Sequence, residues 1–127
     1  RGIGLARSSD TDFVTNIPGR TWPYGVSMEL VRTSTYDGFR KRFSSTEHVE
    51  HVTAWLYQNP SSARTTPIFF EGDPVLRAAR LVVDTPEDLE IMSNSVIASG
   101  EDPVDIATER IAACWLAVKS TLETPPC

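Results

Sequence analysis

The sequence predicts an α/β fold built around a mostly parallel sheet, and the segment Arg80–Met92 carries most of that prediction. The run Ala79–Asp84 is rich in β-branched residues and shows no regular alternation of apolar and polar side chains. This pattern is typical of a strand covered on both faces, as in a parallel sheet flanked by helices. A helix signal begins on the next residue, so the strand and a helix are expected to follow each other directly.

Two strands and a loop are expected near the start of the chain. Asp12–Asn16 is a short apolar run that ends on a polar residue, and Val26–Leu30 alternates apolar with polar side chains, as a half-buried strand does. Between them, Ile17–Gly25 contains two prolines and two glycines, which favours a loop.

Two helices are expected next. Residues 31–43 show a helical pattern, although Gly38 weakens it because glycine has a low helix propensity. In residues 45–60 apolar side chains recur at helical spacing. Thr46 occupies the expected N-cap position, and Pro60 ends the pattern.

One more strand and two more helices complete the expected elements. Thr65–Glu71 is expected to be a strand in which Pro67 favours an edge position, because proline has no N–H to donate to a neighbour. Thr85 is the expected N-cap of a helix Pro86–Ile97. The last helix is expected from Val104 to Leu122, where apolar side chains form a stripe.

The composition indicates one globular domain over residues 1–127, with residues 98–127 as a C-terminal helical extension of unknown role. With 127 residues, 40% of them hydrophobic, the chain can bury one core. The net charge of −5 argues against nucleic acid or an anionic membrane as a partner. No apolar run approaches the ~20 residues that span a bilayer, and the first ten residues lack the apolar core of a secretory signal peptide.

The two cysteines, Cys114 and Cys127, do not form a disulfide framework, which favours a cytoplasmic location. The chain begins at Arg1, so we expect either that a leader was removed or that the chain belongs to a longer product. Three aromatic residues are candidates for the core or for an association face, namely Trp22, Trp55 and Trp115.

Asp84 stands at the carboxyl end of the expected strand, one residue before the helix cap. In open α/β sheets ligands bind beyond the carboxyl ends of strands, and Mg²⁺ takes one or two carboxylates together with phosphate oxygens. Asp84 is therefore a candidate metal ligand, and the alternative is a carboxylate that only bonds local backbone in an Asx-type turn. Arg80 is expected to lie ~13 Å away along an extended strand, too far to neutralise Asp84.

Four blocks of the chain resemble one enzyme family in the same order. "RLVVDTPEDLEIM" (Arg80–Met92) resembles the C-terminal signature of the sugar-activating cytidylyltransferases. This family includes the N-acylneuraminate and 3-deoxy-manno-octulosonate cytidylyltransferases and their spore-coat polysaccharide biosynthesis relatives. "TDFVTN", "RTWPYGVSMEL" and "EHVTAWLYQNP" resemble blocks of the spore-coat branch. The resemblance covers Asp12–Met92 and leaves out residues 93–127.

The resemblance implies a partial Rossmann-like fold of the nucleotide-diphospho-sugar transferase type. It also implies transfer of CMP from CTP to a sugar or sugar acid with release of pyrophosphate, with Mg²⁺ bound by Asp84. Four residues match positions that bind substrate in the family, namely Glu29, His51, Thr53 and Arg80. A homo-oligomer is expected, with no nucleic-acid or membrane partner.

The chain departs from the family pattern at two places. Ser27 stands where the pattern has a carboxylate, and a hydroxyl cannot replace a charged ligand. The family's Gly/Ser-rich loop, which cradles the CTP phosphates, is imitated within residues 1–20, but Asp10 and Asp12 stand where serine and arginine are needed. The chain therefore resembles the second half of such an enzyme and is expected to be inactive alone.

A zinc site is a weaker alternative for the segment Glu47–His51. His48 and His51 are three residues apart, which would place both imidazoles on one face of a helix. No third ligand is evident nearby, although a structural zinc ion needs four.

Two classes of function remain open. One is an enzyme, in which this chain is the C-terminal portion of a CMP-sugar synthetase. The other is a non-catalytic association or sugar-binding module derived from the same family. A phosphate loop encoded in frame upstream of Arg1 would favour the first, and a start codon near Arg1 would favour the second.

Overall fold

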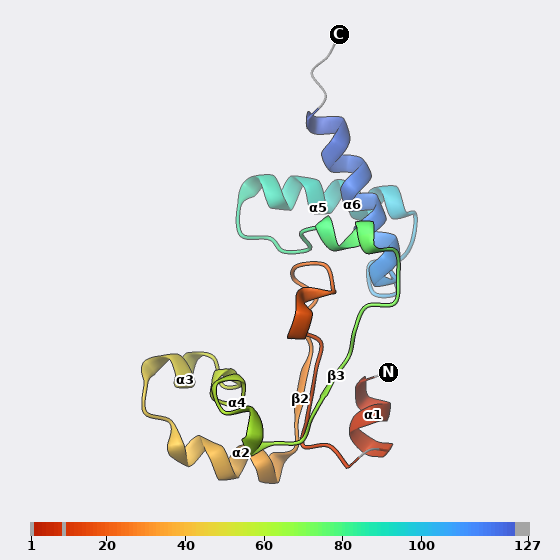
Figure 1. Cartoon of the computed structure of the whole chain (residues 1–127). Coiled ribbons are helices and arrows are strands. Elements are labelled where there is room, and N and C mark those ends of the chain that lie inside the picture. Colours follow the sequence, from red (N-terminus) through yellow and green to blue (C-terminus); the bar gives the residue numbers. More distant parts are fainter. Residues whose placement is uncertain (1, 9, 124–127) are drawn as a thin grey trace. The chain divides into compact units, whose positions relative to one another are not determined.

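The structure is a computed structural model that describes residues 2–8 and 10–123 (Figure 1). Helices and short strands alternate along the chain, which confirms the α/β class. The contacts divide into two compact units. The first contains the described residues up to Pro18 together with Met28–Phe69, and the second contains Gly19–Ser27 together with the described residues from Phe70 onward. The single domain over residues 1–127 stays a prediction.

The first unit contains a three-stranded sheet and a short preceding helix, α1 (Gly2–Ser8). β1 (Phe13–Thr15) is the central strand, with β2 (Glu29–Val31) on one side and β3 (Thr65–Pro67) on the other. β1 pairs antiparallel with β2 and parallel with β3. All three residues of β1 are buried, as expected for a strand with neighbours on both sides.

The pairing follows from the connections between the strands. β2 follows β1 without a crossover helix and therefore returns antiparallel, whereas β3 follows several helices and can pair parallel. The described sheet thus has one parallel and one antiparallel pair, where the sequence predicted a mostly parallel sheet. The strand expected at Val26–Leu30 begins later, at Glu29, and the strand expected from Thr65 ends at Pro67. Pro67 lies on an edge strand, as predicted.

Short helices fill the chain between β2 and β3. They are α2 (Thr33–Phe39), η2 (Arg40–Arg42), α3 (Thr46–Glu50), α4 (Ala54–Gln58) and η3 (Pro60–Ser62). The helical pattern predicted over residues 31–43 is confirmed as α2 followed by η2.

The single helix predicted over residues 45–60 is wrong, because the structure has two helices there. α3 ends at Glu50, because the next residue, His51, has a φ of −115° and a ψ of 80°, outside the helical region. A tertiary contact then joins the two helices, since Nε2 of His48 lies 2.7 Å from Oε1 of Gln58. The N-cap is Ser45 rather than Thr46, and the Ser45 hydroxyl accepts a hydrogen bond from the backbone of His48.

An aromatic core holds the first unit together. Phe13 from β1, Phe39 from α2, and Trp55 and Leu56 from α4 form one buried cluster. The rings of Phe39 and Trp55 stack with centroids 5.3 Å apart and an interplanar angle of 2°. Trp55 is therefore a core residue and not part of an exposed association face.

The second unit is built from helices and loops. Its helices are η4 (Pro74–Ala78), α5 (Pro86–Ser99) and α6 (Thr108–Glu123), and η1 (Pro18–Arg20) straddles the boundary between the units. α5 packs against α6. The buried cluster of this unit is Ala79, Ile91, Ala112 and Trp115.

The start of α5 agrees with the sequence prediction. Thr85 is the N-cap, and its hydroxyl accepts a hydrogen bond from the backbone N–H of Asp88. The carboxylate of Asp88 accepts from the backbone of Thr85 in return, which completes a capping box. α5 ends at Ser99 and is capped by Gly100, which has a φ of 68°, a conformation that glycine adopts at low cost.

The central strand predicted at Ala79–Asp84 is wrong. The segment makes a single parallel bridge, between Tyr24 and Arg80, and no ladder among the described residues. Ala79 is buried by helices, in the cluster with Ile91 and Trp115. Leu81 also packs against this cluster, whereas Val83 is 51% exposed. The second unit has no strand among its described residues, so within it α5 does not pack on a sheet as predicted.

The last helix begins at Thr108 rather than at Val104. Val104 is 90% exposed and belongs to a turn in which the side chain of Asp102 accepts a hydrogen bond from its backbone. Cys114 is a buried free thiol, and Cys127 lies outside the described residues. None of the described helices combines the length and the hydropathy needed to traverse a bilayer.

Candidate functional site

The sequence-predicted site residues belong to two different units. Glu29, His51 and Thr53 are in the first unit, and Arg80 and Asp84 are in the second. The structure therefore describes two local environments, each with its own hydrogen bonds and charges.

Arg80 and Asp84 form an ion pair before the amino end of α5. Nη2 of Arg80 lies 2.5 Å from Oδ2 of Asp84, whose side chain is 65% exposed. The prediction that Asp84 has no arginine partner is therefore wrong. That prediction assumed a straight strand, whereas the chain has no ladder over residues 81–83 and bends at Asp84, which brings the two side chains within reach.

Asp88 organises the turn that leads into α5. Its Oδ2 accepts hydrogen bonds from the backbone N–H groups of Asp84, at 3.1 Å, and Thr85, at 3.0 Å. The bond from the Asp84 backbone is the largest cause of the lowered pKa of Asp88, and desolvation opposes it. Nε of Arg80 lies 3.5 Å from Oδ1 of Asp88. Desolvation also opposes the raised pKa of Arg80, but the carboxylates of Asp88 and Asp84 outweigh it.

Tyr24 lies against Arg80 within the same unit. Its N–H donates to the carbonyl of Ala79 at 3.2 Å, and its carbonyl accepts from the N–H of Leu81 at 2.7 Å. The guanidinium carbon of Arg80 is 5.1 Å from the centroid of the Tyr24 ring, within cation–π range. Gly25 permits this approach, because a Cβ there would lie 2.7 Å from the carbonyl carbon of Leu81.

Asp84 belongs to no cluster of metal ligands among the described residues. No group of three or more His, Cys, Asp or Glu side chains gathers in a metal-binding arrangement within residues 2–8 and 10–123. A structural ion such as zinc needs several protein ligands. Mg²⁺ can take one carboxylate and complete its shell with water and phosphate oxygens. Oδ2 of Asp84 is paired with Arg80 at 2.5 Å, so a Mg²⁺ ion at this exposed carboxylate would have to share it with Arg80.

Glu29 in the first unit is held by a chain of hydroxyl groups. The hydroxyl of Tyr57 donates to Oε1 of Glu29 at 2.5 Å. The same hydroxyl lies 2.7 Å from Oγ1 of Thr15, which is fully buried in β1. The hydroxyl groups of Tyr57 and Thr15 therefore connect Glu29, an exposed residue of β2, to the buried strand β1.

His51 and Thr53 lie at the break between α3 and α4. His51 is exposed, and Thr53 is the half-buried N-cap residue of α4 without a side-chain capping hydrogen bond. His48 is instead the buried histidine, with its ring paired to Gln58. The two imidazoles have different environments, which gives no support to the zinc alternative.

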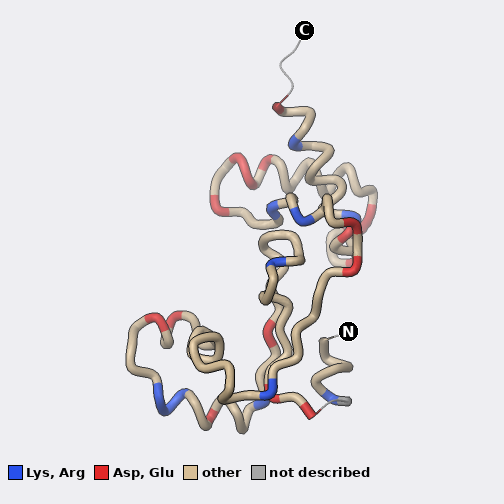
Figure 2. The backbone as a smooth tube through the Cα atoms, viewed as in Figure 1, with Lys and Arg blue, Asp and Glu red and all other residues tan. Residues whose placement is uncertain are grey.

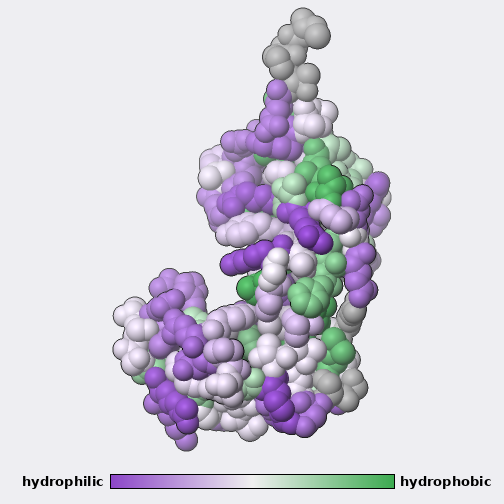
Figure 3. Space-filling view, in the orientation of Figure 1, coloured by the Kyte–Doolittle hydropathy of each residue, from purple (hydrophilic) through white to green (hydrophobic). Residues whose placement is uncertain are grey.

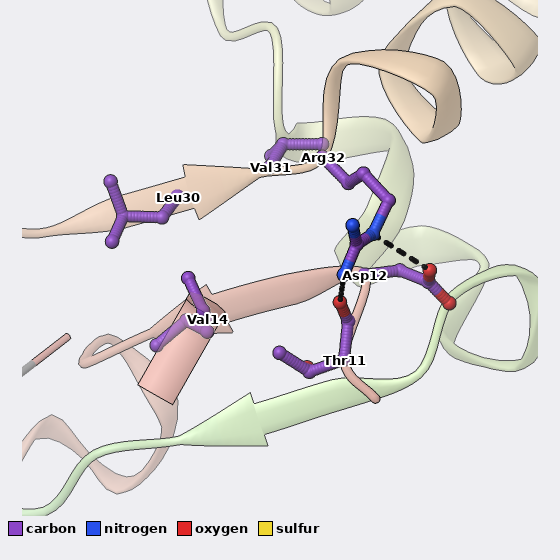
Figure 4. A pocket seen from close by; sticks show the side chains of 7 residues that line it. Thr11, Asp12, Val14, Leu30, Val31 and Arg32 are labelled. Carbon is purple, nitrogen blue, oxygen red and sulfur yellow. Dashed lines mark hydrogen bonds and ion pairs between the residues drawn. The ribbon is translucent and has the colours of Figure 1, made fainter. Parts of the chain in front are cut away.

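A cavity of about 110 Å³ opens beside β1 and β2 in the first unit. Figure 4 shows Asp12 and Arg32 at one end of it, with Arg32 donating to the carbonyl of Thr11 at 3.0 Å. Asp12 is also bound by Arg64, whose Nε lies 2.9 Å from Oδ2. The hydrogen bonds from Arg64 are the main cause that lowers the pKa of Asp12 to about 2. The carboxylate is fully engaged by arginines and serves as a structural brace.

Sequence reasoning missed three residues of these environments. Tyr24 and Asp88 both contact Arg80, and Tyr57 contacts Glu29. The capping-box pattern pointed to Asp88, but only as a helix start. No local pattern could assign Tyr57 to Glu29, which is 28 residues earlier in the chain.

The comparisons with known proteins show the fold. No family model matches the chain, and no curated protein matches it. Among solved structures, it resembles a cytidylyltransferase from Leptospira borgpetersenii serovar Hardjo-bovis, with a TM-score of 0.69 and 18% sequence identity. The match covers 93% of this chain and 47% of that chain. The chain thus has the fold of part of a cytidylyltransferase and spans about half the length of that protein.

Proposed function

We propose that this chain is part of a nucleotidyltransferase that couples CTP to a sugar or sugar acid, giving a CMP-sugar and pyrophosphate. The observation that carries the proposal is the structural likeness to a cytidylyltransferase over 93% of the chain. The four sequence blocks between Asp12 and Met92 support it independently, because they resemble the sugar-activating branch of such enzymes.

In this proposal the second unit supplies the residues that act on the nucleotide phosphates. Asp84 provides a carboxylate to Mg²⁺, which when bound neutralises the charge that develops on the nucleotide phosphates. Arg80 orients that carboxylate and keeps Asp88 in place. Glu29, His51 and Thr53 contact the substrate, with Glu29 oriented by Tyr57.

The chain alone is expected not to make a CMP-sugar. Turnover requires the triphosphate to be held in line for attack, and the loop that cradles phosphates has no good counterpart in the sequence. The experiment incubates the chain with CTP, Mg²⁺ and candidate sugar acids and measures pyrophosphate release. No release is expected from this chain, and release is expected from a longer product that supplies a phosphate loop. Robust release by the chain alone would show that the expectation of inactivity is wrong.

The second candidate is a non-catalytic association or sugar-binding module. Ser27, an exposed hydroxyl at a carboxylate position of the family pattern, favours it. The upstream coding sequence and a binding assay distinguish the two candidates. A start codon near Arg1, together with sugar binding that is independent of CTP and Mg²⁺, would support the module.

In either case we propose a cytoplasmic protein that forms homo-oligomers or binds a completing half. Apolar side chains remain on the surface of the described helices, with Ile97 on α5 76% exposed, and such surfaces favour association. Light scattering at increasing protein concentration tests this. A monomer at all concentrations would contradict self-association.

A further inference from the structure

A second cavity, of about 240 Å³, lies in the first unit and is lined by none of the residues assigned to a site above. It is formed by α2, η2, α4 and η3. Its lining includes three hydroxyl side chains, one guanidinium and two aromatic rings, namely Ser34, Thr35, Ser62, Arg42, Phe39 and Trp55. We refer to it as the Arg42 cavity.

The two aromatic residues that line the Arg42 cavity are already ordered by packing. Phe39 and Trp55 are 4% and 7% exposed, and their rings stack nearly parallel. Side chains in such a buried cluster keep one arrangement. A ligand that contacts these two rings therefore does not pay the entropy cost of ordering them on binding.

Arg42 lies over the ring of Trp55 and has no carboxylate partner among the described residues. Its guanidinium carbon lies 5.7 Å from the centroid of the Trp55 ring, within the range of a cation–π contact. No carboxylate of the described residues pairs with Arg42, whereas the neighbouring Arg40 pairs with Asp37 at 2.9 Å. Figure 2 shows the basic residues gathered on the segment that leads from α2 to α3, and Figure 3 shows hydrophilic side chains over that region.

The chemistry of the lining selects a small polar anion. A guanidinium presents a planar fork of donors that matches carboxylate and phosphate oxygens. The three hydroxyl groups can both donate and accept hydrogen bonds, which suits a ligand that carries hydroxyls of its own. The volume of about 240 Å³ is below the roughly 300–1,000 Å³ of sites for drug-sized ligands.

We propose that the Arg42 cavity binds a small polyol that carries an oxyanion, with Arg42 pairing the anionic group and Ser34, Thr35 and Ser62 bonding the hydroxyls. This site does not depend on the proposed nucleotidyltransferase activity, because it shares none of the residues assigned to that activity.

A series of three-carbon probes tests the ligand class. Glycerol, glycerate and glycerol 3-phosphate share a polyol and differ in the anionic group. Each is titrated into the isotope-labelled chain, and the assigned indole N–H resonance of Trp55 is followed by NMR. Saturable shifts are expected with at least one of the two anions and not with glycerol. Binding of glycerate, of the phosphate, or of both would say which oxyanion the guanidinium accepts. No shift with either anion, or an equal shift with glycerol, would overturn the proposal.

Three variants test the location. Arg42→Gln removes the charge and is expected to weaken binding of the responsive anion by about tenfold or more, as for loss of a charged hydrogen bond. Gly38→Leu fills the cavity, since a Cβ at Gly38 meets no atom within 4 Å, and is expected to abolish binding while the chain stays folded. Lys41→Gln, with the same charge change beside the cavity, is the control and should bind as the unmodified chain does.

Two results would contradict this location. Lys41→Gln could weaken binding as much as Arg42→Gln, which would show general charge attraction and no site. Gly38→Leu could bind as the unmodified chain does, which would place the anion elsewhere. Thermal melts followed by circular dichroism confirm that each variant is folded before binding is compared.

Discussion

Replacing Gly25 with alanine should detach the loop that holds Tyr24 beside Arg80. Gly25 has a φ of +99°, a conformation that costs an L-residue about 1–2 kcal/mol. The new methyl group would also overlap the carbonyl of Leu81 and lie 2.7 Å from Cγ1 of Val82. Because the atoms it meets include backbone, the loop has to move away.

That movement breaks the two backbone hydrogen bonds between Tyr24 and the segment Ala79–Leu81. Each such bond contributes about 0.5–1.5 kcal/mol. Together with the backbone strain, the free energy of unfolding should fall by about 2–5 kcal/mol.

Two other glycines serve as matched controls for the Gly25 variant. Gly100 also has a positive φ, of 68°, but a Cβ there meets nothing within 4 Å. Gly100→Ala should therefore lower the free energy of unfolding only by the cost of backbone strain, about 1–2 kcal/mol. Gly38 is helical with open space around it, and Gly38→Ala should stabilise the chain by about 0.5–1 kcal/mol. Urea unfolding gives the free energies, and hydrogen exchange at the amides of Tyr24 and Leu81 reports the loop. Gly25→Ala could lower the free energy of unfolding no more than Gly100→Ala does, with both amides still protected. In that case the close approach of Gly25 to Leu81 is not what requires glycine at this position.

Three further predictions concern single side chains. The lowered pKa of Asp12, about 2 against a usual 3.8, contributes stability that is present above its usual pKa and is lost as the pH falls toward 2. Asp12→Asn should therefore have a lower melting temperature than the unmodified chain at neutral pH, and this difference should become smaller as the pH falls. A difference in melting temperature that stays constant from pH 7 to pH 2 would argue against the arginine brace. Tyr57→Phe removes the hydroxyl that joins Glu29 to Thr15 and should cost about 1–2 kcal/mol in urea unfolding, while no change would mean that water replaces it. Asp84→Asn should leave the melting temperature nearly unchanged, because exposed ion pairs contribute little to stability. The same variant should abolish Mg²⁺-dependent turnover in a longer product that contains the complete enzyme. A large loss of stability with turnover intact would show that Asp84 serves only the turn before α5.

The features that the sequence predicted correctly depend on neighbours within a few residues. The capping box of Thr85 and Asp88 is one example, because both hydrogen bonds join residues three apart. Pro67 on an edge strand is another, because the missing N–H is a property of proline itself. The order of the resemblance blocks also predicted the fold that the structural comparison shows.

The largest errors concern features that long-range contacts decide. The apolar run Ala79–Asp84 suits either a central strand or a segment buried by helices, and only the packing of Ala79 against Ile91 and Trp115 distinguishes them. The separation of Arg80 from Asp84 was wrong for the same reason, since it assumed that strand.

The sequence by itself determined the α/β class, the capping box of α5 and the residue types available for binding. Only the tertiary structure decided their partners: Tyr57 for Glu29, Gln58 for His48, and Trp55 for Arg42. The physical reason is distance along the chain. Caps and turns are set by hydrogen bonds between near neighbours, whereas the burial and pairing of a side chain depend on segments that only folding brings together.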